Sequence, residues 1–231
     1  MTSIAQNIAS IRQRIPQHVT MVCVSKFKTI ETILEAYNIG ERNFGESRVQ
    51  ELLPKYEALP KDIQWHFIGH LQTNKVRMIV PFIYLIHSVD SLRLLETINR
   101  EAQKIQRHIK VLLEVHVAKE ETKSGFTPEE LLSLRTSLSN LNHIEICGIM
   151  GMATNTDDEQ EIRRCFQSIK QLAYDCKFRQ HFERVPKKYQ RDTEDIISMG
   201  MSDDYPIAIE EGSTMIRIGS AIFGEREITT T

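Results

Sequence analysis

The chain has 231 residues, of which 41% are hydrophobic and 26% charged, and its formal net charge at pH 7 is -2. These are ordinary values for a globular protein with a sizeable core, and the balanced charge argues against nucleic acid as a partner. The length fits one large α/β unit, so we expect a single domain over residues 1–231. Residues 1–16 contain no apolar run and no segment is long enough to span a bilayer, so we expect a cytoplasmic protein without membrane contacts.

Short strands and amphipathic helices alternate along the whole chain. Runs of apolar and β-branched residues predict eight strands, over residues 19–25, 43–45, 65–69, 84–89, 111–117, 144–150, 196–199 and 215–223. Strands separated by helices pair in parallel, and eight such units close into a (β/α)8, TIM-like barrel. An open doubly wound sheet is the alternative, but the chain has no Gly-x-Gly-x-x-Gly turn.

Several helix starts stand between these strands. Thr127-Pro128-Glu129-Glu130 combines an N-cap residue, a proline at the first helical position and a glutamate that completes a capping box. Ser47 and Gln50 predict a second capping box, and Asp157 is expected to open a longer helix. The polar stretch 177–195 is interpreted as a helix end followed by a surface loop.

Cysteines and histidines give little sign of a metal site. The four cysteines lack Cys-x-x-Cys spacing, so we expect buried, reduced thiols. His66 and His70 straddle a strand end instead of one helical turn, and His87 and His116 lie in strands without a carboxylate ligand set. Packing or ligand contacts are the expected roles of these histidines, and no metal is expected.

The first strand ends on a lysine, at the face where barrels of this kind carry their functional groups. Lys26 shares its side of the strand with Val22 and Val24 by the two-residue period. A lone lysine is more often a solvated surface residue. At this face, however, desolvation and neighbouring cations would lower its pKa and free its amine to attack an aldehyde.

The seventh and eighth strands carry small residues where barrels of this kind bind phosphate. Ser198-Met199-Gly200-Met201-Ser202 follows the seventh strand, and Arg217-Ile218-Gly219-Ser220 lies in the eighth. Gly219 lets a backbone N–H approach a ligand closely, and Ser220 adds a hydroxyl. Barrel packing with glycines at turns would explain each segment alone, but both fall on the expected strands. Together with Lys26, they suit a phosphorylated aldehyde held as a Schiff base.

Arg217 limits the kinds of reaction that such a site can support. Its guanidinium stays protonated at ordinary pH, so facing a pyridine nitrogen it would leave that nitrogen unprotonated. The ring then becomes a poorer electron sink than one paired with a carboxylate. A site of this kind suits holding pyridoxal phosphate more than stabilising carbanions.

Sequence strings from nearly the whole chain resemble the pyridoxal phosphate homeostasis protein family, which is also described as alanine racemase N-terminal-domain-like. The matching strings are Val24-Ser25-Lys26, Asn43-Phe44-Gly45-Glu46, Trp65-His66-Phe67-Ile68-Gly69, Leu71-Gln72-Thr73-Asn74-Lys75, His87-Ser88-Val89-Asp90-Ser91, Lys123-Ser124-Gly125, Gly148-Ile149-Met150, the stretch 197–204 and the stretch 212–224. Two positions depart from the family pattern: Ser47 replaces the usual Asn, and His70 replaces the usual Pro.

The resemblance implies a TIM-like barrel that binds pyridoxal 5′-phosphate through a Schiff base on Lys26. It implies that Arg217 lies near the pyridine nitrogen. The other cofactor contacts would come from Ser198, Met199, Gly219 and Ser220. It further implies a role in supplying and buffering the cofactor, with pyridoxal-phosphate-dependent apoenzymes as possible recipients. No catalytic residue is assigned, because no turnover reaction is established for such a carrier.

Two other functions would use the same lysine. A slow pyridoxal-phosphate-dependent amino-acid racemase shares this barrel, but it needs a second acid–base group, commonly a tyrosine from another domain. The eight units fill the chain, so we expect a carrier that is not an enzyme. A Schiff-base aldolase acting on a sugar phosphate would be colourless, whereas a pyridoxal-phosphate protein is yellow. Because the sequence shows no large apolar stripe, we also expect a monomer.

Overall fold

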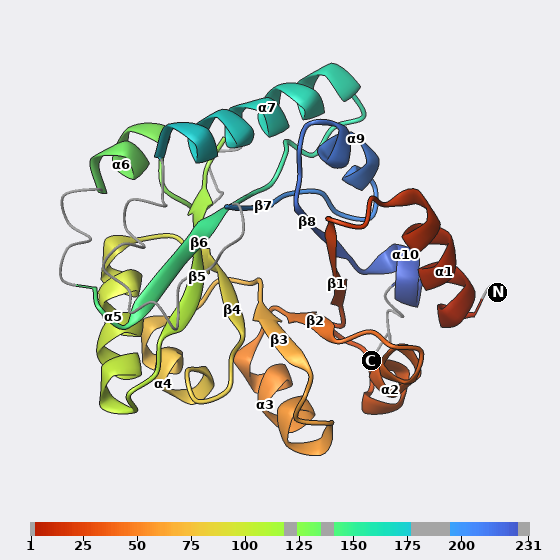
Figure 1. The fold of residues 1–231 in the computed structure, drawn as a ribbon, viewed down its shortest axis with the longest axis horizontal. Helices are drawn as coiled ribbons and strands as arrows, with labels where there is room; N and C mark the ends of the chain where they lie inside the picture. Colours follow the sequence, from red (N-terminus) through yellow and green to blue (C-terminus); the bar gives the residue numbers. More distant parts are fainter. Residues whose placement is uncertain (1–2, 118–123, 135–140, 177–194, 226–231) are drawn as a thin grey trace, which may run out of the picture.

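The computed structural model describes residues 3–117, 124–134, 141–176 and 195–225, and it shows eight parallel strands closed into one barrel (Figure 1). Each strand pairs with its neighbours in sequence, and the last strand closes the ring by pairing with the first. The predicted (β/α)8 barrel is therefore confirmed. The strands are β1 Thr20–Val24, β2 Asn43–Glu46, β3 Gln64–Phe67, β4 Leu85–Val89, β5 Ile109–Val115, β6 Ile144–Gly151, β7 Ile196–Ser198 and β8 Met215–Ile218.

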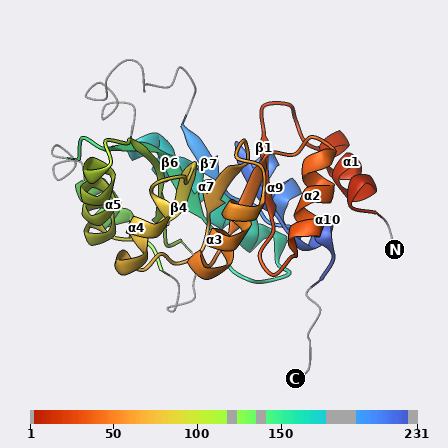
Figure 2. The same ribbon diagram turned by 90° about the horizontal axis from the view of Figure 1, so that it is seen from below.

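Helices surround this ring of strands (Figures 1 and 2). The predicted capping box at Thr127 is confirmed, since its hydroxyl accepts from Glu130 N at 3.2 Å and Glu130 Oε2 accepts from Thr127 N at 2.9 Å. The helices are α1 Ile4–Arg14, α2 Ile30–Asn38, α3 Val49–Ala58, the 3-10 turn η1 Thr73–Lys75, α4 Val76–Ile79, α5 Leu92–Lys104, α6 Pro128–Ser133, α7 Glu159–Cys176, α9 Tyr205–Glu210 and α10 Ser220–Phe223.

Side chains inside the barrel form an apolar cluster separate from the main core between strands and helices. Along β1, Val22 belongs to the inner cluster, whereas Met21 and Cys23 belong to the outer core. This alternation follows from the two-residue period of a strand, and it leaves both faces of the sheet buried. The inner cluster consists of Val22, Leu85, Leu112, Cys147, Met150, Ile196 and Met215.

Three local predictions are wrong. The eighth strand ends at Ile218, and residues 220–223 form α10, because a short apolar run does not distinguish a strand from a buried helix. The predicted Ser47–Gln50 capping box does not form, since Arg48 is the N-cap of α3 and makes no side-chain cap hydrogen bond. At the start of α7 it is Asp158, not Asp157, that accepts from Gln160 N, at 2.9 Å. Residues 177–194 lie outside the described part of the chain.

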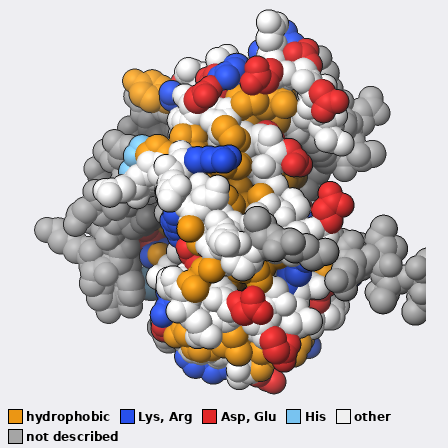
Figure 3. All heavy atoms as spheres, turned by 90° about the vertical axis from the view of Figure 1, so that its right-hand side faces the viewer, with side chains coloured by type: hydrophobic (Ala, Val, Ile, Leu, Met, Phe, Trp, Pro, Cys, Tyr) orange, Lys and Arg blue, Asp and Glu red, His pale blue; other side chains and the backbone are white. Residues whose placement is uncertain are grey.

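The remaining bulk predictions concern thiols, membranes and surface. All four cysteines of the sequence are buried and free, as predicted. In the described ranges no helix combines the length and the apolar character needed to cross a membrane. On the face shown in Figure 3, hydrophobic side chains lie among acidic and basic ones.

Candidate functional site

The pairing of β1 with β8 brings the segment that contains Lys26 close to the segment that contains Arg217. Val22 lies opposite Arg217 and Cys23 opposite Ile218, so the turns after both strands leave the barrel at the same end. β7 lies on the other side of β8. Lys26, which follows β1, and the segment 217–220 therefore lie at the same end of the barrel.

Lys26 lies in a tight turn that follows β1. Its neighbour Phe27 has a φ of 64°, a left-handed conformation that is rare for an aromatic residue. Hydrogen bonds hold this turn: Lys28 N donates to Ser25 O at 3.1 Å, and Phe27 N donates to Glu51 Oε2 at 2.9 Å. Strained backbone persists only where its surroundings impose it, and such residues cluster at functional sites. The Lys26 side chain itself is exposed.

Lys28 ties the Lys26 turn to the C-terminal end of α10, the short helix that follows β8. Its Nζ donates to three carbonyl oxygens at the end of α10: Phe223 at 2.9 Å, Gly224 at 3.2 Å and Glu225 at 3.2 Å. A lysine at a helix C-terminus satisfies carbonyls that have no partner within the helix. Hydrogen bonds thus connect the segment after β1 with the segment after β8. The role of Lys28 in this connection was not predicted from the sequence.

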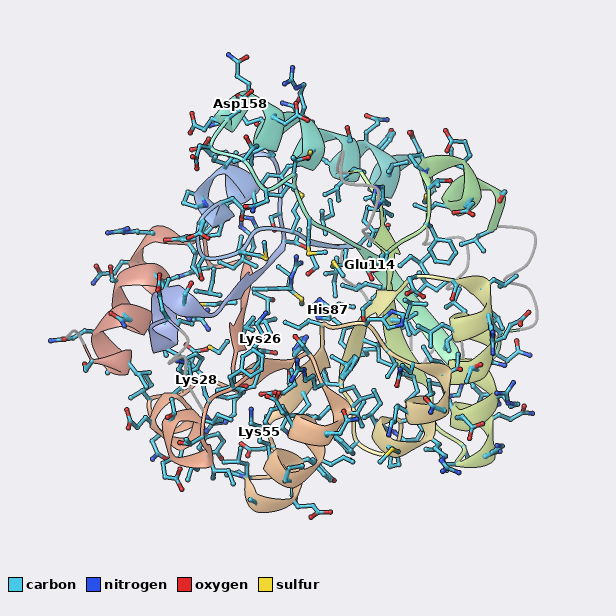
Figure 4. All side chains as sticks on the ribbon, turned by 180° about the vertical axis from the view of Figure 1, so that it is seen from behind. Lys26, Lys28, Lys55, His87, Glu114 and Asp158 are labelled. Carbon is cyan, nitrogen blue, oxygen red and sulfur yellow. The ribbon has the colours of Figure 1, made fainter. Side chains whose placement is uncertain are left out.

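Behind this turn lies a buried ion pair. Lys55 Nζ is 2.7 Å from Glu46 Oε1 and donates to Ser25 O at 2.9 Å, while Ser25 Oγ donates to the same Glu46 oxygen at 2.6 Å. Burial raises the pKa of Glu46, and Lys55 and Ser25 act against this effect. The network fixes Ser25, the residue between the end of β1 and Lys26. Figure 4 shows Lys55 on α3 and Lys26 within the ring of strands.

Arg217 is buried inside the barrel below the turns, with 5% of its surface exposed. Its Nη1 donates to the carbonyl and the hydroxyl of Ser198, both at 2.8 Å, and Nη2 donates to Gly151 O at 3.2 Å. Burial lowers the pKa of Arg217 to about 10, so the guanidinium remains charged at neutral pH. No hydrogen bond recorded within the described part of the chain uses Nε, which leaves this donor for a ligand.

A chain of buried hydrogen bonds orients Arg217 from across the barrel. Ser198 Oγ is 3.1 Å from His87 Nδ1, His87 Nε2 is 2.9 Å from His66 Nδ1, and His66 Nε2 is 3.1 Å from Asn43 Oδ1. Burial lowers the pKa of both histidines, that of His66 to about 3, so both rings are neutral.

The neutral rings allow one assignment of the protons along this chain. Asn43 Oδ1 can only accept, so His66 Nε2 donates to it and His66 Nδ1 accepts from His87 Nε2. His87 Nδ1 then accepts from the Ser198 hydroxyl, whose oxygen accepts from Arg217. The histidines are structural groups that hold Ser198 and Arg217. Within the described residues no group of three or more potential ligands could hold a metal ion.

Two glycines near this end of the barrel have different reasons to be glycine. Gly200 has a φ of 95°, and a Cβ there would lie 2.6 Å from the Cβ of Ala208, so the fold requires it. Gly219 has a φ of -117°, and a Cβ there would make only ordinary contacts with Val24, at 3.4 Å and beyond. Packing therefore does not explain Gly219. Without a side chain at this position, a ligand can approach the backbone closely.

The turn after β8 presents backbone N–H groups to a single hydroxyl. Gly219 N and Ala221 N donate to Ser202 Oγ at 3.2 Å and 3.3 Å. Ser220 is exposed at the same turn, whereas Ser198 and Met199 are fully buried beneath it. Ser202 belongs to the segment that the sequence analysis noted, but it was not named as a site residue.

Glu114 is a second buried carboxyl, at the end of β5 and 4% exposed. Its Oε1 accepts from Ser124 Oγ at 3.0 Å. Burial raises its pKa to about 7; Asp90 adds to this effect, while Ser124, Arg217 and His70 oppose it. Glu114 was not predictable as a site residue, because a single glutamate in an apolar run gives no signal of its environment.

The two departures from the family pattern lie close to each other at the rim. A Cβ on Gly69 would meet the Ser47 carbonyl at 2.3 Å, so these two backbones are in close contact. His70, 65% exposed, lies with its Nδ1 3.1 Å from Asp90 Oδ2. The replacement of proline thus gives the rim a titratable group that faces Asp90.

Comparison with known proteins agrees with this arrangement. The family model "Alanine racemase, N-terminal domain" matches residues 1–227. The pyridoxal phosphate homeostasis protein of Haemophilus influenzae is 36% identical over 215 residues, which cover 92% of this chain and 87% of the relative. That of Aquifex aeolicus is 40% identical over 204 residues, covering 88% and 85%. The chain belongs to the pyridoxal phosphate homeostasis protein family.

Several solved structures share the fold. PipY of Synechococcus elongatus with pyridoxal phosphate bound is 36% identical, covers 96% of this chain and 100% of its own, and superposes with a TM-score of 0.84. The TM-score to PipY without the cofactor is 0.87. Alanine racemase of Corynebacterium glutamicum, 15% identical with a TM-score of 0.74, is matched over 62% of its length and shares the fold alone.

Proposed function

We propose that this protein binds pyridoxal 5′-phosphate as a Schiff base on Lys26 and holds it reversibly, as a vitamin B6 homeostasis protein. The observation that carries the proposal is that Lys28 joins the Lys26 turn to the end of α10, the short helix that begins directly after Gly219. The PipY relative, whose structure contains the cofactor, supports it.

The phosphate of the cofactor fits the turn after β8. Backbone N–H groups of Gly219 and Ala221 converge on Ser202 Oγ, and this convergence of donors is what a phosphate oxygen needs. Gly219 leaves room for close approach, and the exposed Ser220 adds a hydroxyl. Ser198 lies on the neighbouring strand β7, where its two oxygens accept from Arg217.

Arg217 fits the pyridine nitrogen through its Nε donor. The charged guanidinium holds its proton, so the nitrogen would accept a hydrogen bond without becoming protonated. The cofactor supplies an electrophilic aldehyde and an electron-accepting ring, and the second property is weakened by this partner. We therefore infer a carrier that is not an enzyme.

A slow amino-acid racemase is the alternative. Glu114 favours it, because a carboxyl with a pKa of about 7 can both take and give a proton at neutral pH. Tyr205, the tyrosine near the phosphate turn, is buried at the start of α9, so it is not placed as the second base. Incubation with L-alanine tests the alternative: rapid appearance of D-alanine would contradict the carrier assignment.

The carrier would be a cytoplasmic monomer that hands its cofactor to pyridoxal-phosphate-dependent apoenzymes. Transfer of the absorbing cofactor to an added apoenzyme, faster than its spontaneous release, is the expected result for such a recipient.

The absorption spectrum with added pyridoxal phosphate tests the central proposal. The protein should gain a visible band that borohydride removes, and Lys26→Ala should lack it. Lys61→Ala, which removes an exposed lysine on the outside of the barrel, is the matched control and should keep it. A band of equal strength in Lys26→Ala would show that another lysine holds the aldehyde.

The two glycines test the phosphate cradle separately from the lysine. Gly219→Ala should fold with nearly unchanged stability but bind the cofactor more weakly, because its Cβ fills the space for the phosphate. Gly200→Ala should lose stability, by about 1–3 kcal/mol, because of its left-handed backbone and the clash with Ala208. Unchanged affinity in Gly219→Ala would place the phosphate elsewhere.

A further inference from the structure

A groove on the flank of the barrel lies outside the site described above. It has a volume of about 550 Å³ and runs between the η1–α4 segment and α5. Thr73, Asn74 and Arg77 line one wall, and Arg93 and Arg100 lie on the other. Thr73 and Asn74 belong to the sequence segment 71–75, which resembles the family pattern. The proposed cofactor site does not include these residues.

The positive charge of the groove is only partly compensated. Glu101 pairs with Lys104 at 2.8 Å and lies 3.5 Å from Arg100, so this carboxylate already has a closer cation. Across the described ranges, no ion pair is recorded for Arg77 or Arg93. Glu96 is the remaining carboxylate of the lining. Three guanidiniums therefore face two carboxylates, one of which is engaged elsewhere.

Arg93 stands where a cation costs stability. It is the second residue of α5, a 13-residue helix without an acidic residue in its first turn. The N-terminal end of a helix carries partial positive charge and favours anions. An arginine at this place is repelled by the helix dipole. An anion bound between Arg93 and Arg77 would interact favourably with both guanidiniums and with the positive end of the helix.

The lining of the groove selects the kind of anion. Its volume of about 550 Å³ falls within the roughly 300–1,000 Å³ of small-molecule sites. Such sites are mostly apolar, but this lining consists of threonine, asparagine, arginine and glutamate side chains without an aromatic ring. Nothing here would stack on a base or a pyridine ring. Thr73, Asn74 and Glu96 instead offer partners for hydroxyl groups.

We propose that this groove is a second ligand site, which binds a phosphorylated polyol, such as a sugar phosphate, through Arg77 and Arg93. The guanidiniums take the phosphate oxygens, since their fork matches that geometry. Thr73, Asn74 and Glu96 take the hydroxyls. This site is independent of the proposed cofactor function.

Calorimetric titration of the whole protein with ribose 5-phosphate at physiological ionic strength tests the proposal. The parent should bind it, and Arg77→Gln and Arg93→Gln should each weaken binding about tenfold through loss of a charged hydrogen bond. Arg14→Gln, an exposed arginine in the last turn of α1, is the matched control and should bind like the parent. All three side chains are exposed, so folding should be preserved.

Four results would overturn the proposal: no binding to the parent, equal affinity in both groove variants, inorganic phosphate binding as tightly as ribose 5-phosphate, or a glutamate peptide binding in its place. Equal affinity in the variants would place the sugar phosphate elsewhere, such as at the turn after β8. The visible band formed with pyridoxal phosphate should be the same in parent and groove variants. If the protein did not bind pyridoxal phosphate, the titration with ribose 5-phosphate would still test the groove.

Discussion

Two buried carboxyl groups, Glu46 at the end of β2 and Glu114 at the end of β5, differ in their partners. Glu46 is fully buried beside the ammonium of Lys55, at 2.7 Å, and accepts from Ser25 as well. Glu114 has a hydroxyl as its recorded hydrogen-bond partner, Ser124 at 3.0 Å. A carboxylate with a buried cation becomes part of the framework. One with only a hydroxyl remains able to change its charge near neutral pH.

The largest effect should come from removing the cation beside Glu46. Lys55→Met leaves a buried carboxylate without its partner, and such a loss costs about 3–5 kcal/mol of unfolding free energy. Urea unfolding at pH 7 measures it. Lys104→Met, which breaks an exposed pair with Glu101, is the control and should cost less than about 1 kcal/mol. Equal losses of unfolding free energy in Lys55→Met and Lys104→Met would show that the buried ion pair of Glu46 matters no more than an exposed one.

A double variant sharpens this result. Glu46→Gln combined with Lys55→Met removes both charges, so it should recover most of the stability lost by Lys55→Met alone. Replacing a buried ion pair by neutral groups of similar size is often close to neutral in stability. A double variant as unstable as the sum of its single changes would contradict the pairing.

Glu114→Gln should raise the unfolding free energy above neutral pH, whereas Lys55→Met should lower it. The native pKa of about 7 lies above the ordinary value of 4.5, so the folded state binds the proton more tightly. Unfolding free energy of the parent therefore falls as the pH rises between these two values, by up to about 3 kcal/mol. The variant should lack this fall and exceed the parent at pH 8, while the two converge at pH 4. Comparing the two proteins at each pH cancels the titration of His66 and His87.

Ser124→Ala should give the smallest effect. The Ser124 hydroxyl donates to the Glu114 carboxylate and so stabilises its ionised form. Its loss should raise the pKa of Glu114 further and cost about 1 kcal/mol at pH 8, with little change at pH 4. A carboxyl carbon NMR titration of Glu114 measures the midpoint. A midpoint that stays the same or falls would show that Ser124 does not support the charge.

The barrel was predictable from the sequence because its strands are short, apolar and regularly separated by capped helices. The fourth strand, predicted over 84–89, is observed as Leu85–Val89. The eighth was predicted too long, since the helix 220–223 continues the same apolar run. Periodicity over four residues cannot separate these two conformations.

The contacts of the site were less predictable than its main residues. Lys26, Arg217 and Gly219 stand next to strand ends, where topology alone brings them together. Lys28 meets α10 across 195 residues of sequence, and no local pattern signals such a pair. His87 lies in a strand without a carboxylate ligand set and His66 precedes a strand end; both signals indicated packing or ligand contacts in place of a metal site.

The sequence separation of 195 between Lys28 and Phe223 also bears on how the protein is made. Contacts this far apart in sequence form late, because a large loop must close before they contribute to stability. During synthesis the amine of Lys26 emerges long before β8 and its turn of small residues. The proposed cradle for the phosphate would therefore exist only after the ring of strands has closed, and a nascent chain that stops short of β8 would present Lys26 without it.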